Sequence, residues 1–448
     1  PVHHFPPRRS AGAELYTFRL ARWLIQHGHT AEVVCVERID APGDGLAAVR
    51  DEYQGVPVWR LSFDAARAPD PLLWSYRNPL ITRWFEGYLQ NEQPDLVHQQ
   101  SGYLMGAGVL EAAQRAGVPA VLTLHDFWFL CPRITLLRGD GKCCEQVPAD
   151  PAGCAWCMRL ESRRYRLADA ATGGLLGRAA LSTLGAEGQA IGERRRYLGA
   201  ALRGVASAIA PSRFLAQRFA GLLEPEQIKV LRYGLDTTRL QHTPARIDDG
   251  VLRLGYIGQI AQHKGVHLLV QAVQALPPNG PAIEVVIYGD LDQHARYSRD
   301  LQQRAAGDAR IRFAGRFDNA QIAEVLASFD ATVVPSIWYE NSPLAIMEAQ
   351  AAGRPVITSA LGGMAELVRD DVDGLHFQPN DAADLARQIQ RLRDERGLIG
   401  RLRQGVTSPP TIDDEMAQLL AIYERACAGQ GRATLEMAAA ISSVGVTQ

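Results

Sequence analysis

The chain lacks any run of 18 apolar residues, so we expect no helix that crosses a membrane. It also shows no secretory leader near its first residue. Neither sign of charge is in excess: the formal net charge of the 448 residues is -2, which argues against a surface built to bind polyanions. The composition, with 47% apolar and 21% charged residues, is typical of a globular protein. We therefore expect a cytoplasmic protein, with peripheral contact at the inner face of the membrane left open.

The order of the predicted elements indicates two domains. A chain of 448 residues is too long for one ordinary core, and strands alternate with helices throughout, which favours an α/β protein with parallel sheets. The chain begins within what we interpret as a strand that starts a few residues earlier. The predicted strands are 31–36, 95–98, 120–124, the end of 202–209, 252–257, 283–288, 311–313, 331–334 and 355–358. We expect domains at 1–210 and 211–405, a helix in 406–428 and a tail at 429–448.

Two glutamates eight residues apart are the most informative motif. Glu340 follows an apolar, β-branched strand, and Glu348 lies in the helix after it. Ser342 and Pro343 have the character of an N-cap and a first helical position, and Gly353 that of the residue after the helix. Carboxylates accept hydrogen bonds from sugar hydroxyls, and a helix N-terminus attracts phosphate. The motif therefore predicts a ligand that carries both.

Three glycine-bearing turns follow other strands. Gly258 and Gln259 end the strand 252–257, and Lys264 follows on the same loop, where a lysine can neutralise a leaving diphosphate. Gly12 lies in the turn Ser10-Ala-Gly-Ala-Glu14 before the first long helix, at 13–27. Gly363 lies in a Gly-Gly-x-x-Glu turn that ends in Glu366, which could equally be a structural residue of a first helical turn.

His125 directly follows the strand 120–124, at the edge where α/β proteins bind ligands. His98 ends another strand, and a ligand-binding and a structural role are equally open for it. The sequence offers no Ser/His/Asp triad.

Five of the seven cysteines fall within a segment at 131–157, which we interpret as an insertion in the first domain. In a cytoplasmic protein such clustering favours a metal over disulfides, and four thiolates would form a structural zinc site. Cys131, Cys154 and Cys157, with Cys143 or Cys144 as the fourth ligand, form the natural set; we chose Cys143. Free thiols or an oxidised pair are the alternative.

Arginines are grouped at 8–9, at 163–166 and at 194–196. We interpret these groups as solvated faces, with an anionic lipid headgroup as the less favoured partner. No aromatic residues are interleaved with them to stack on bases, so nucleic acid is excluded as a partner.

The motifs resemble those of the GT-B fold retaining glycosyltransferases, in particular the GT4-like family (glycosyl transferases group 1). The resemblance covers about 3–405 and is most specific in Pro-Ser-x-x-Tyr-Glu-Asn-Ser-Pro-Leu before Glu348. It implies two Rossmann-like domains with parallel sheets facing across a cleft, an acceptor side in 1–210 and a nucleotide-sugar donor domain in 211–405. A last helix in this family crosses back to the first domain.

The resemblance also implies roles for single residues. Catalytic roles fall to Lys264 on the leaving diphosphate and to Glu340 and His125 on the donor sugar, while Glu348 would hold the ribose. The donor-binding residues that it implies are Gly12, Gly258, Gln259, Lys264, Asn341, Ser342, Pro343, Leu344, Glu348 and Gly363. The implied reaction moves a sugar, with retention and without a metal cofactor, from a UDP- or GDP-sugar to a hydroxyl of a sugar, glycan or lipid-linked acceptor. Bacterial polysaccharide or glycolipid synthesis is the family's commonest setting.

Two positions depart from the family pattern. Ala11 replaces the first glycine of the first turn, and Gln259 replaces an arginine, which removes a permanent charge. They leave two alternatives open: an epimerase or hydrolase that uses the nucleotide sugar alone, and a non-catalytic sugar-nucleotide-binding protein.

Overall fold

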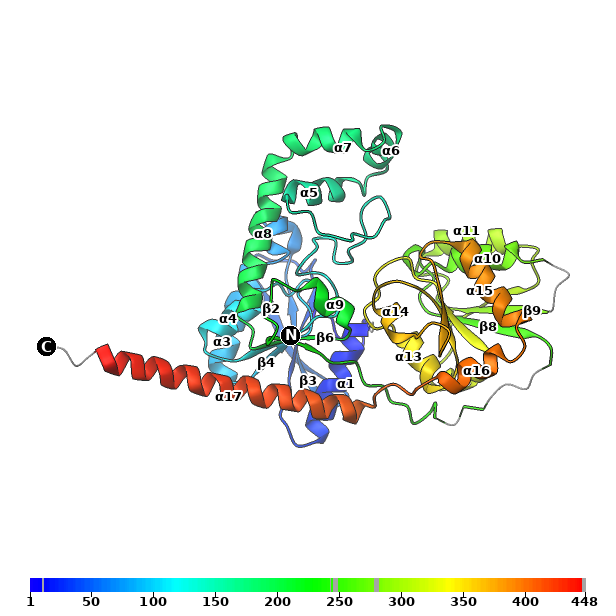
Figure 1. The fold of residues 1–448 in the computed structure, drawn as a ribbon. Helices are drawn as coiled ribbons and strands as arrows, with labels where there is room; N and C mark the ends of the chain where they lie inside the picture. Colours follow the sequence, from blue (N-terminus) through cyan, green and yellow to red (C-terminus); the bar gives the residue numbers. More distant parts are fainter. Residues whose placement is uncertain (10–11, 242, 245–248, 278–281, 445–448) are drawn as a thin grey trace. The chain divides into compact units, whose positions relative to one another are not determined.

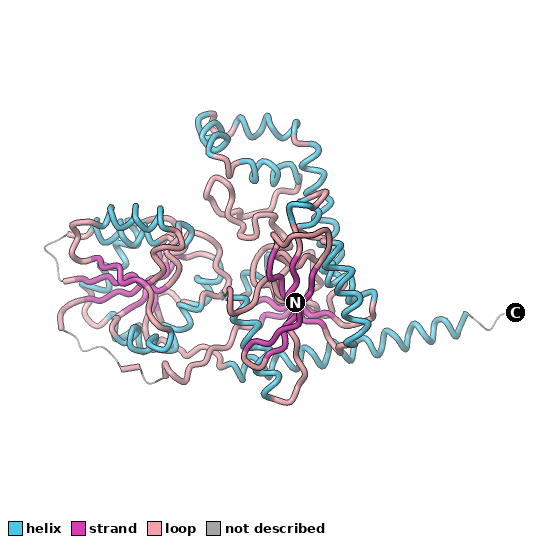
Figure 2. The backbone as a smooth tube through the Cα atoms, turned by 180° about the vertical axis from the view of Figure 1, so that it is seen from behind, coloured by secondary structure: helices cyan, strands magenta, loops and turns pink. Residues whose placement is uncertain are grey.

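The computed structural model describes residues 1–9, 12–241, 243–244, 249–277 and 282–444. The chain forms two compact units. Unit 1 consists of residues 1–211, 216–231 and 416 onward, and unit 2 of 212–215 and 232–415. Each unit is an α/β structure with parallel strand pairs (Figures 1 and 2).

Unit 2 is built on one parallel sheet with the strand order β10-β9-β8-β11-β12-β13. The strands are β8 (Leu252–Ile257), β9 (Ile283–Tyr288), β10 (Ile311–Gly315), β11 (Ala331–Val334), β12 (Val356–Ser359) and β13 (Gly374–Phe377). All five strands predicted here are present, and β13 is an addition. The chain builds outward from β8 in one direction and from β11 in the other. The carboxyl ends of β8 and β11 therefore flank a topological switch point, where α/β sheets bind ligands.

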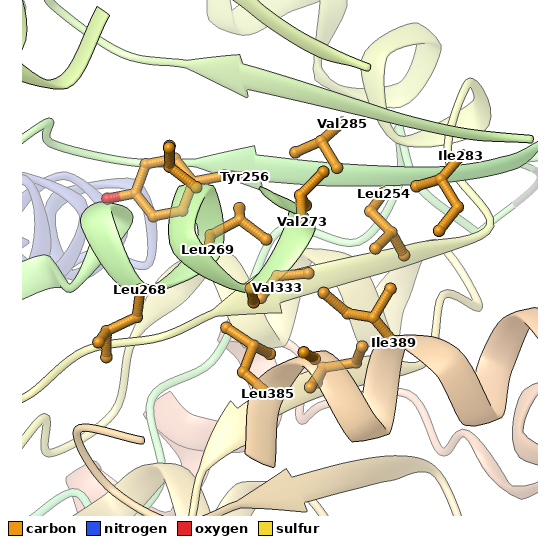
Figure 3. Close-up of a cluster of buried hydrophobic side chains, with 14 of the residues drawn as sticks. Leu254, Tyr256, Leu268, Leu269, Val273, Ile283, Val285, Val333, Leu385 and Ile389 are labelled. Carbon is orange, nitrogen blue, oxygen red and sulfur yellow. The ribbon is translucent and has the colours of Figure 1, made fainter. Parts of the chain in front are cut away.

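Helices cover both faces of this sheet, with α10, α11 and α15 on one side and α13 and α14 on the other (Figure 1). They are α10 (Val266–Ala275), α11 (Ala295–Ala305), α12 (Ile322–Ala327), α13 (Leu344–Ala351), α14 (Gly362–Leu367), α15 (Ala382–Asp394) and α16 (Leu398–Gly405). One buried cluster joins β8, β9 and β11 to α10 and α15, with Leu254, Leu269 and Leu385 among its members (Figure 3). Both faces of the strands are apolar because both are covered, as expected for a parallel sheet.

Unit 1 contains two sheets. The strands β1 (Val33–Arg38), β2 (Ala47–Tyr53) and β3 (Val56–Ser62) have the order β1-β3-β2, with β2 antiparallel. The strands β4 (Val97–Gln99), β5 (Ala120–Thr123), β6 (Ser207–Ala210) and β7 (Ile228–Val230) form a parallel sheet in sequence order. Val2 pairs with Cys35 of β1, and the Gln100 N–H after β4 donates to the Pro1 carbonyl oxygen. The first residues thus lie between the two sheets, and the loops after residue 2, β4 and β5 meet at one edge.

The predicted helix at 13–27 is α1 (Gly12–Gln26), and the region 158–200 is helical as expected. The remaining helices are α2 (Pro71–Trp74), α3 (Pro79–Glu92), α4 (Gly108–Arg115), α5 (Pro151–Arg159), α6 (Arg163–Ala171), α7 (Leu175–Ala180), α8 (Gly185–Arg203), α9 (Arg213–Arg218) and α17 (Ile412–Val444). In unit 1, α5 packs against α8 (Figure 1). Helix α17 extends beyond the segment where we expected its end, into the predicted tail.

Within the described residues, no helix combines the length and the apolar character that a bilayer-spanning segment requires.

Candidate functional site

An ion pair at the switch point is the centre of the candidate site in unit 2. Lys264 Nζ lies 2.6 Å from Glu340 Oε1, which also accepts hydrogen bonds from Ser336 Oγ at 2.9 Å and Trp338 Nε1 at 2.8 Å. The Lys264 ammonium lies 5.3 Å from the centre of the Trp338 ring. The loop after β8 and the loop after β11 therefore meet through one carboxylate oxygen.

The environment of Glu340 keeps its carboxylate charged. Burial alone would raise its pKa, but the charge of Lys264 and the hydrogen bonds from Lys264, Trp338 and Ser336 outweigh burial, and the pKa lies below its usual value. The ring of His263 packs against Trp338, with the ring centres 4.9 Å apart. Burial, followed by the charge of Lys264, lowers the pKa of His263 to about 4, so this imidazole is neutral at physiological pH. Lys264 is thus paired with a charged carboxylate and lies next to a neutral imidazole.

Two glycines allow the loops to approach each other. Gly265 has φ +69°, and a Cβ there would overlap the carbonyl oxygen of Pro335. A Cβ on Gly363 would overlap the carbonyl oxygen of Asn341, and the Gly363 N–H donates to the Glu340 carbonyl oxygen at 2.8 Å. Only glycine fits these positions, so the turns after β8 and β12 are both shaped by backbone contact.

Helix α13 begins one residue later than the sequence predicted. Pro343, with φ -68° and ψ 121°, is the N-cap, and Leu344 is the first helical residue. The expected N-cap, Ser342, instead directs its Oγ to Met347 Sδ at 3.5 Å. Because Pro343 supplies no side-chain cap, the first N–H groups of α13 are not satisfied by a side chain of the cap residue. Glu348 lies in the second turn and is half-buried.

The neighbouring residues complete the loops. Asn341 is nearly buried, whereas Gly258 and Gln259 are half-buried at the end of β8. The Gln259 carbonyl oxygen accepts a hydrogen bond from Tyr256 Oη at 2.7 Å. Glu366, which we had weighed as a ligand, accepts the backbone N–H of Phe214 through Oε2 at 3.0 Å. This contact gives Glu366 a structural role.

In unit 1, His125 lies where the sequence placed it, directly after β5. Its Nε2 is 3.0 Å from Gln100 Oε1, and its ring packs edge-on against Tyr16 with the ring centres 5.1 Å apart. Burial, followed by the nearby His3, lowers the pKa of His125 to about 3, so the ring is neutral. Asp126 caps the following turn by accepting the N–H of Trp128 at 2.8 Å.

Glu14 and His3 are members of this cluster that the sequence did not identify as site residues. His3 Nε2 lies 3.2 Å from Glu14 Oε1, and Glu14 is 3% exposed. The second oxygen, Glu14 Oε2, is buried without a hydrogen-bond partner among the described residues. The position of Glu14, two residues after Gly12 at the start of α1, was the sequence feature that could have identified it as a site residue. No atom of the described residues that lie beyond its chain neighbours and the adjacent backbone of α1 comes within 4 Å of where a Gly12 Cβ would stand, and Ser10 and Ala11 of the same turn lie outside the described residues.

His98 proves to be structural. Its Nδ1 contacts Tyr423 Oη on α17 and its Nε2 contacts Thr123 Oγ1 at 2.8 Å, so both ring nitrogens are used. Burial lowers its pKa well below the usual value.

The structure revises the predicted set of clustered thiols. Cys131, Cys154 and Cys157 line one cavity, as expected, but their fourth neighbour is Cys144. Cys143, the fourth ligand that we chose, is not part of the cavity wall. As they stand, the described residues contain no group of three or more His, Cys, Asp or Glu side chains positioned to hold a metal ion.

These observations define a class: a two-unit α/β protein with a charged site at the switch point of its second sheet. Solved glycosyltransferases of the GT-B fold share the architecture. A glycosyltransferase from Rickettsia africae superposes with a TM-score of 0.63 at 15% identity, covering 95% of this chain and 98% of its own. Anabaena Alr3699/HepE in complex with UDP-glucose superposes with a TM-score of 0.56 at 16% identity, covering 96% of this chain and 99% of its own. The fold is therefore GT-B.

The family follows from sequence. Residues 11–234 match the model of the glycosyl transferase 4-like domain, and residues 238–405 match that of glycosyl transferases group 1. The chain belongs to this GT4-like glycosyltransferase family.

Two relatives illustrate the range of the family. The glycogen synthase of Mycobacterium tuberculosis is 32% identical over 192 residues, which are 41% of this chain and 44% of that protein. The 2-deoxystreptamine glucosyltransferase of Streptomyces kanamyceticus is 29% identical over 189 residues, which are 40% of this chain and 48% of that protein. The chain spans about half the length of the relatives it matches.

Proposed function

We propose that this protein is a retaining glycosyltransferase, which moves a sugar from a nucleoside diphosphate sugar to an acceptor hydroxyl without a metal cofactor. The observation that carries the proposal is the Lys264–Glu340 pair at the switch point of unit 2. It sets a cation beside a sugar-binding carboxylate, which is what a ligand with a diphosphate next to a hexose requires.

We assign the diphosphate to Lys264 and to the first N–H groups of α13. The helix supports this assignment because its N-cap, Pro343, leaves those donors to other partners. Lys264 supplies the charge that a divalent cation would otherwise supply to the departing phosphate. Glu348, four residues after Leu344 in the same helix, is assigned to the ribose hydroxyls. The solved relatives with UDP-glucose or with ADP support a nucleotide of this kind.

The state of Glu340 supports front-face attack over a covalent intermediate. Three donors converge on its Oε1, and its pKa is lowered, so this carboxylate is a weak nucleophile and a weak base. In the proposed reaction the bond from the anomeric carbon to the phosphate oxygen breaks, and the acceptor oxygen bonds to the same face. The acceptor proton passes to the leaving phosphate. Glu340 orients the sugar through hydrogen bonds, and we assign the same role to the neutral His125 on the family resemblance alone.

The names of relatives support a sugar-rich acceptor. They include a glycogen synthase and a putative colanic acid biosynthesis glycosyltransferase. We propose a growing polysaccharide or a glycolipid as the acceptor in a bacterium, and contact with the inner face of the membrane remains part of this proposal.

The first test measures thermal shift with UDP, GDP, ADP and dTDP and their sugars, without metal. We expect one nucleotide series to raise the melting temperature, and Glu348→Gln to weaken that affinity about tenfold through loss of charge-assisted hydrogen bonds. Glu324→Gln is the matched control, because Glu324 is exposed on α12. The nucleotide sugar that binds is then incubated with and without sugar acceptors. Turnover that needs no acceptor would favour an epimerase or hydrolase, and the absence of any nucleotide binding would contradict the proposal.

A further inference from the structure

The cysteine-rich segment of unit 1 encloses a small cavity lined by four thiols. Cys131, Cys144, Cys154 and Cys157 all contribute to the wall of this space of about 20 Å³, which is enough for one water-sized occupant. Cys154 and Cys157 project from α5, whereas Cys131 and Cys144 come from the irregular segment before it. All four are free thiols.

The lining of the cavity separates Cys144 from Cys143. Cys144 lines it together with Cys131, Cys154 and Cys157. Cys143 is not among the lining residues and instead pairs with Leu137 in an isolated β-bridge. Two adjacent cysteines therefore face different surroundings, and only Cys144 belongs with the other three.

The irregular segment packs directly on α5 beside the thiols. Gly139 lies so close to α5 that a Cβ there would overlap the Cys157 carbonyl oxygen. The segment that carries Cys131 and Cys144 is therefore held against the helix that carries Cys154 and Cys157.

A buried arginine beside the thiols lacks an anionic partner. Arg194 on α8 is 1% exposed, donates to the Trp128 carbonyl oxygen and lies 5.1 Å from the Trp128 ring centre. Its Nη1 has no hydrogen-bond partner among the described residues. Burial lowers its pKa to about 10, so it still carries a charge at neutral pH.

The next residue extends the same cationic environment. Arg195 Nη2 lies 3.0 Å from Cys154 Sγ, and its Nε is also buried without a partner among the described residues. The group at 194–196 is therefore not wholly a solvated face, because Arg194 is buried and Arg195 contacts Cys154. A buried cation is costly unless an anion compensates it, so the surroundings call for negative charge in the cysteine cluster.

We propose that Cys131, Cys144, Cys154 and Cys157 bind one zinc ion as a tetrathiolate. Zinc with four thiolates is a dianion, and it supplies the negative charge that the arginines lack. Binding expels one proton from each thiol as the four zinc–sulfur bonds form, with no change of oxidation state. As described, the four side chains line the cavity without forming a metal-binding group, so zinc binding would require them to draw closer together.

The site would stabilise the part of unit 1 with the least regular structure. Between β5 and α5 the chain runs from 124 to 150 without a named helix or strand. A segment of this length orders only at a cost in conformational entropy. A zinc ion would tie Cys131 and Cys144 of this segment to α5, which packs on α8. It would thereby fix the chain that follows His125.

The test compares two adjacent cysteines in the full chain. We expect the purified protein to contain one zinc per chain by mass spectrometry of the metal, and Cys144→Ser to retain at least tenfold less after dialysis against a chelator. Cys143→Ser should retain zinc as the parent does. Replacement by Co²⁺ should give the thiolate-to-cobalt charge-transfer absorption of a tetrahedral sulfur site, weakened in the Cys144 variant and unchanged in the Cys143 variant.

The readouts also distinguish failure of folding from failure of the proposal. If Cys144→Ser does not fold, Cys157→Ser and the wild-type cobalt spectrum decide the matter. A folded parent with no metal and four thiols that react with a disulfide reagent would overturn the proposal. So would equal zinc loss in the Cys143 and Cys144 variants, a disulfide among the four, or iron in place of zinc.

Discussion

The two units differ in sheet topology and in the side chains at the ends of their parallel strands. Unit 2 has one six-stranded parallel sheet with a switch point between β8 and β11, whereas unit 1 has a three-stranded mixed sheet and a four-stranded parallel sheet. In unit 2 the loops after β8 and β11 bring Lys264 and Glu340 together as an ion pair, whereas in unit 1 the loops after β4 and β5 bring Gln100 and His125 together. The buried His125 ring is neutral, whereas Lys264 and Glu340 form a charged pair. The two units therefore present different chemistry at the carboxyl ends of their strands.

The glycines of the two units differ in the same way. A Cβ on Gly363 in unit 2 would overlap the Asn341 carbonyl oxygen, whereas a Cβ on Gly12 in unit 1 would meet no atom of the described residues beyond its chain neighbours and the adjacent backbone of α1. The turn at Gly363 is therefore fixed by contact between two loops, and no such contact is described at Gly12.

The largest effect should come from removing the cation of unit 2. Lys264→Met should lower kcat/KM for sugar transfer by about 10³-fold, because the developing charge on the leaving diphosphate loses its counter-charge. Steady-state transfer assays measure this effect. Lys229→Met, in β7 of unit 1, is the matched control and should stay within about twofold of the parent. Comparable losses in the two variants would contradict the assignment.

The second-largest expected effect is on the free energy of unfolding, and it compares the turns at Gly363 and Gly12. Gly363→Ala should reduce the free energy of unfolding by about 3 kcal/mol, since a Cβ there overlaps backbone. Gly12→Ala, at the start of α1, should change it by less than about 1 kcal/mol. Denaturant unfolding of both proteins measures the difference. A Gly363 variant as stable as the Gly12 variant would show that the loop contact is not required.

A smaller effect on rate is expected in unit 1. His125→Asn should lower kcat/KM by about 10- to 100-fold, because it removes a neutral hydrogen-bonding group and no charge. The loss in kcat/KM is measured with the same transfer assay as for Lys264→Met. The salt dependence of KM for the donor should be the same in His125→Asn and the parent. A loss as large as that of the Lys264 variant would erase the distinction between the two units.

The smallest effect is a difference in the pH dependence of stability. The folded pKa of His125, about 3, lies below its value in the unfolded chain, so the unfolded state binds more protons between about pH 6.5 and 3. Stability therefore falls as pH falls through this window, by up to about 1.4 kcal/mol per pH unit for this group. Glu340, whose pKa is lowered, adds a loss of stability only when the pH falls below the usual titration range of a glutamate. Denaturant unfolding at pH 7, 6 and 5 should give a shallower slope for His125→Asn, and an unchanged slope would count against the buried neutral state.

The sequence predicted the strands of unit 2 better than those of unit 1. All five strands predicted in unit 2 are present, whereas β2, β3 and β7 of unit 1 were missed. Of these, β2 is largely exposed and carries no apolar alternation. The four-residue β13 is too short to stand out from a turn. The N-cap of α13 is Pro343, one residue after the predicted N-cap Ser342, whose hydroxyl contacts Met347 instead.

Side-chain partners were harder to predict than strands. Lys264 and Glu340 were both identified, but that they form one ion pair follows from the order of β8 and β11 in the sheet, which spacing along the chain does not encode. Cys143 and Cys144 are indistinguishable as neighbours in sequence, and only the path of the loop turns one of them toward α5. Glu14 and His3 escaped notice because their contact depends on residues 1–3 lying between two sheets.

The central claim is that Lys264 in unit 2 binds the diphosphate of the donor. Calorimetric titration of the parent and Lys264→Met with UDP, GDP, ADP and dTDP, and with the matching monophosphates, tests it most directly. For the nucleotide that the parent binds, we predict a loss of about 10- to 100-fold in affinity for the diphosphate and little change for the monophosphate. Equal affinity of the two proteins for the diphosphate would contradict the account.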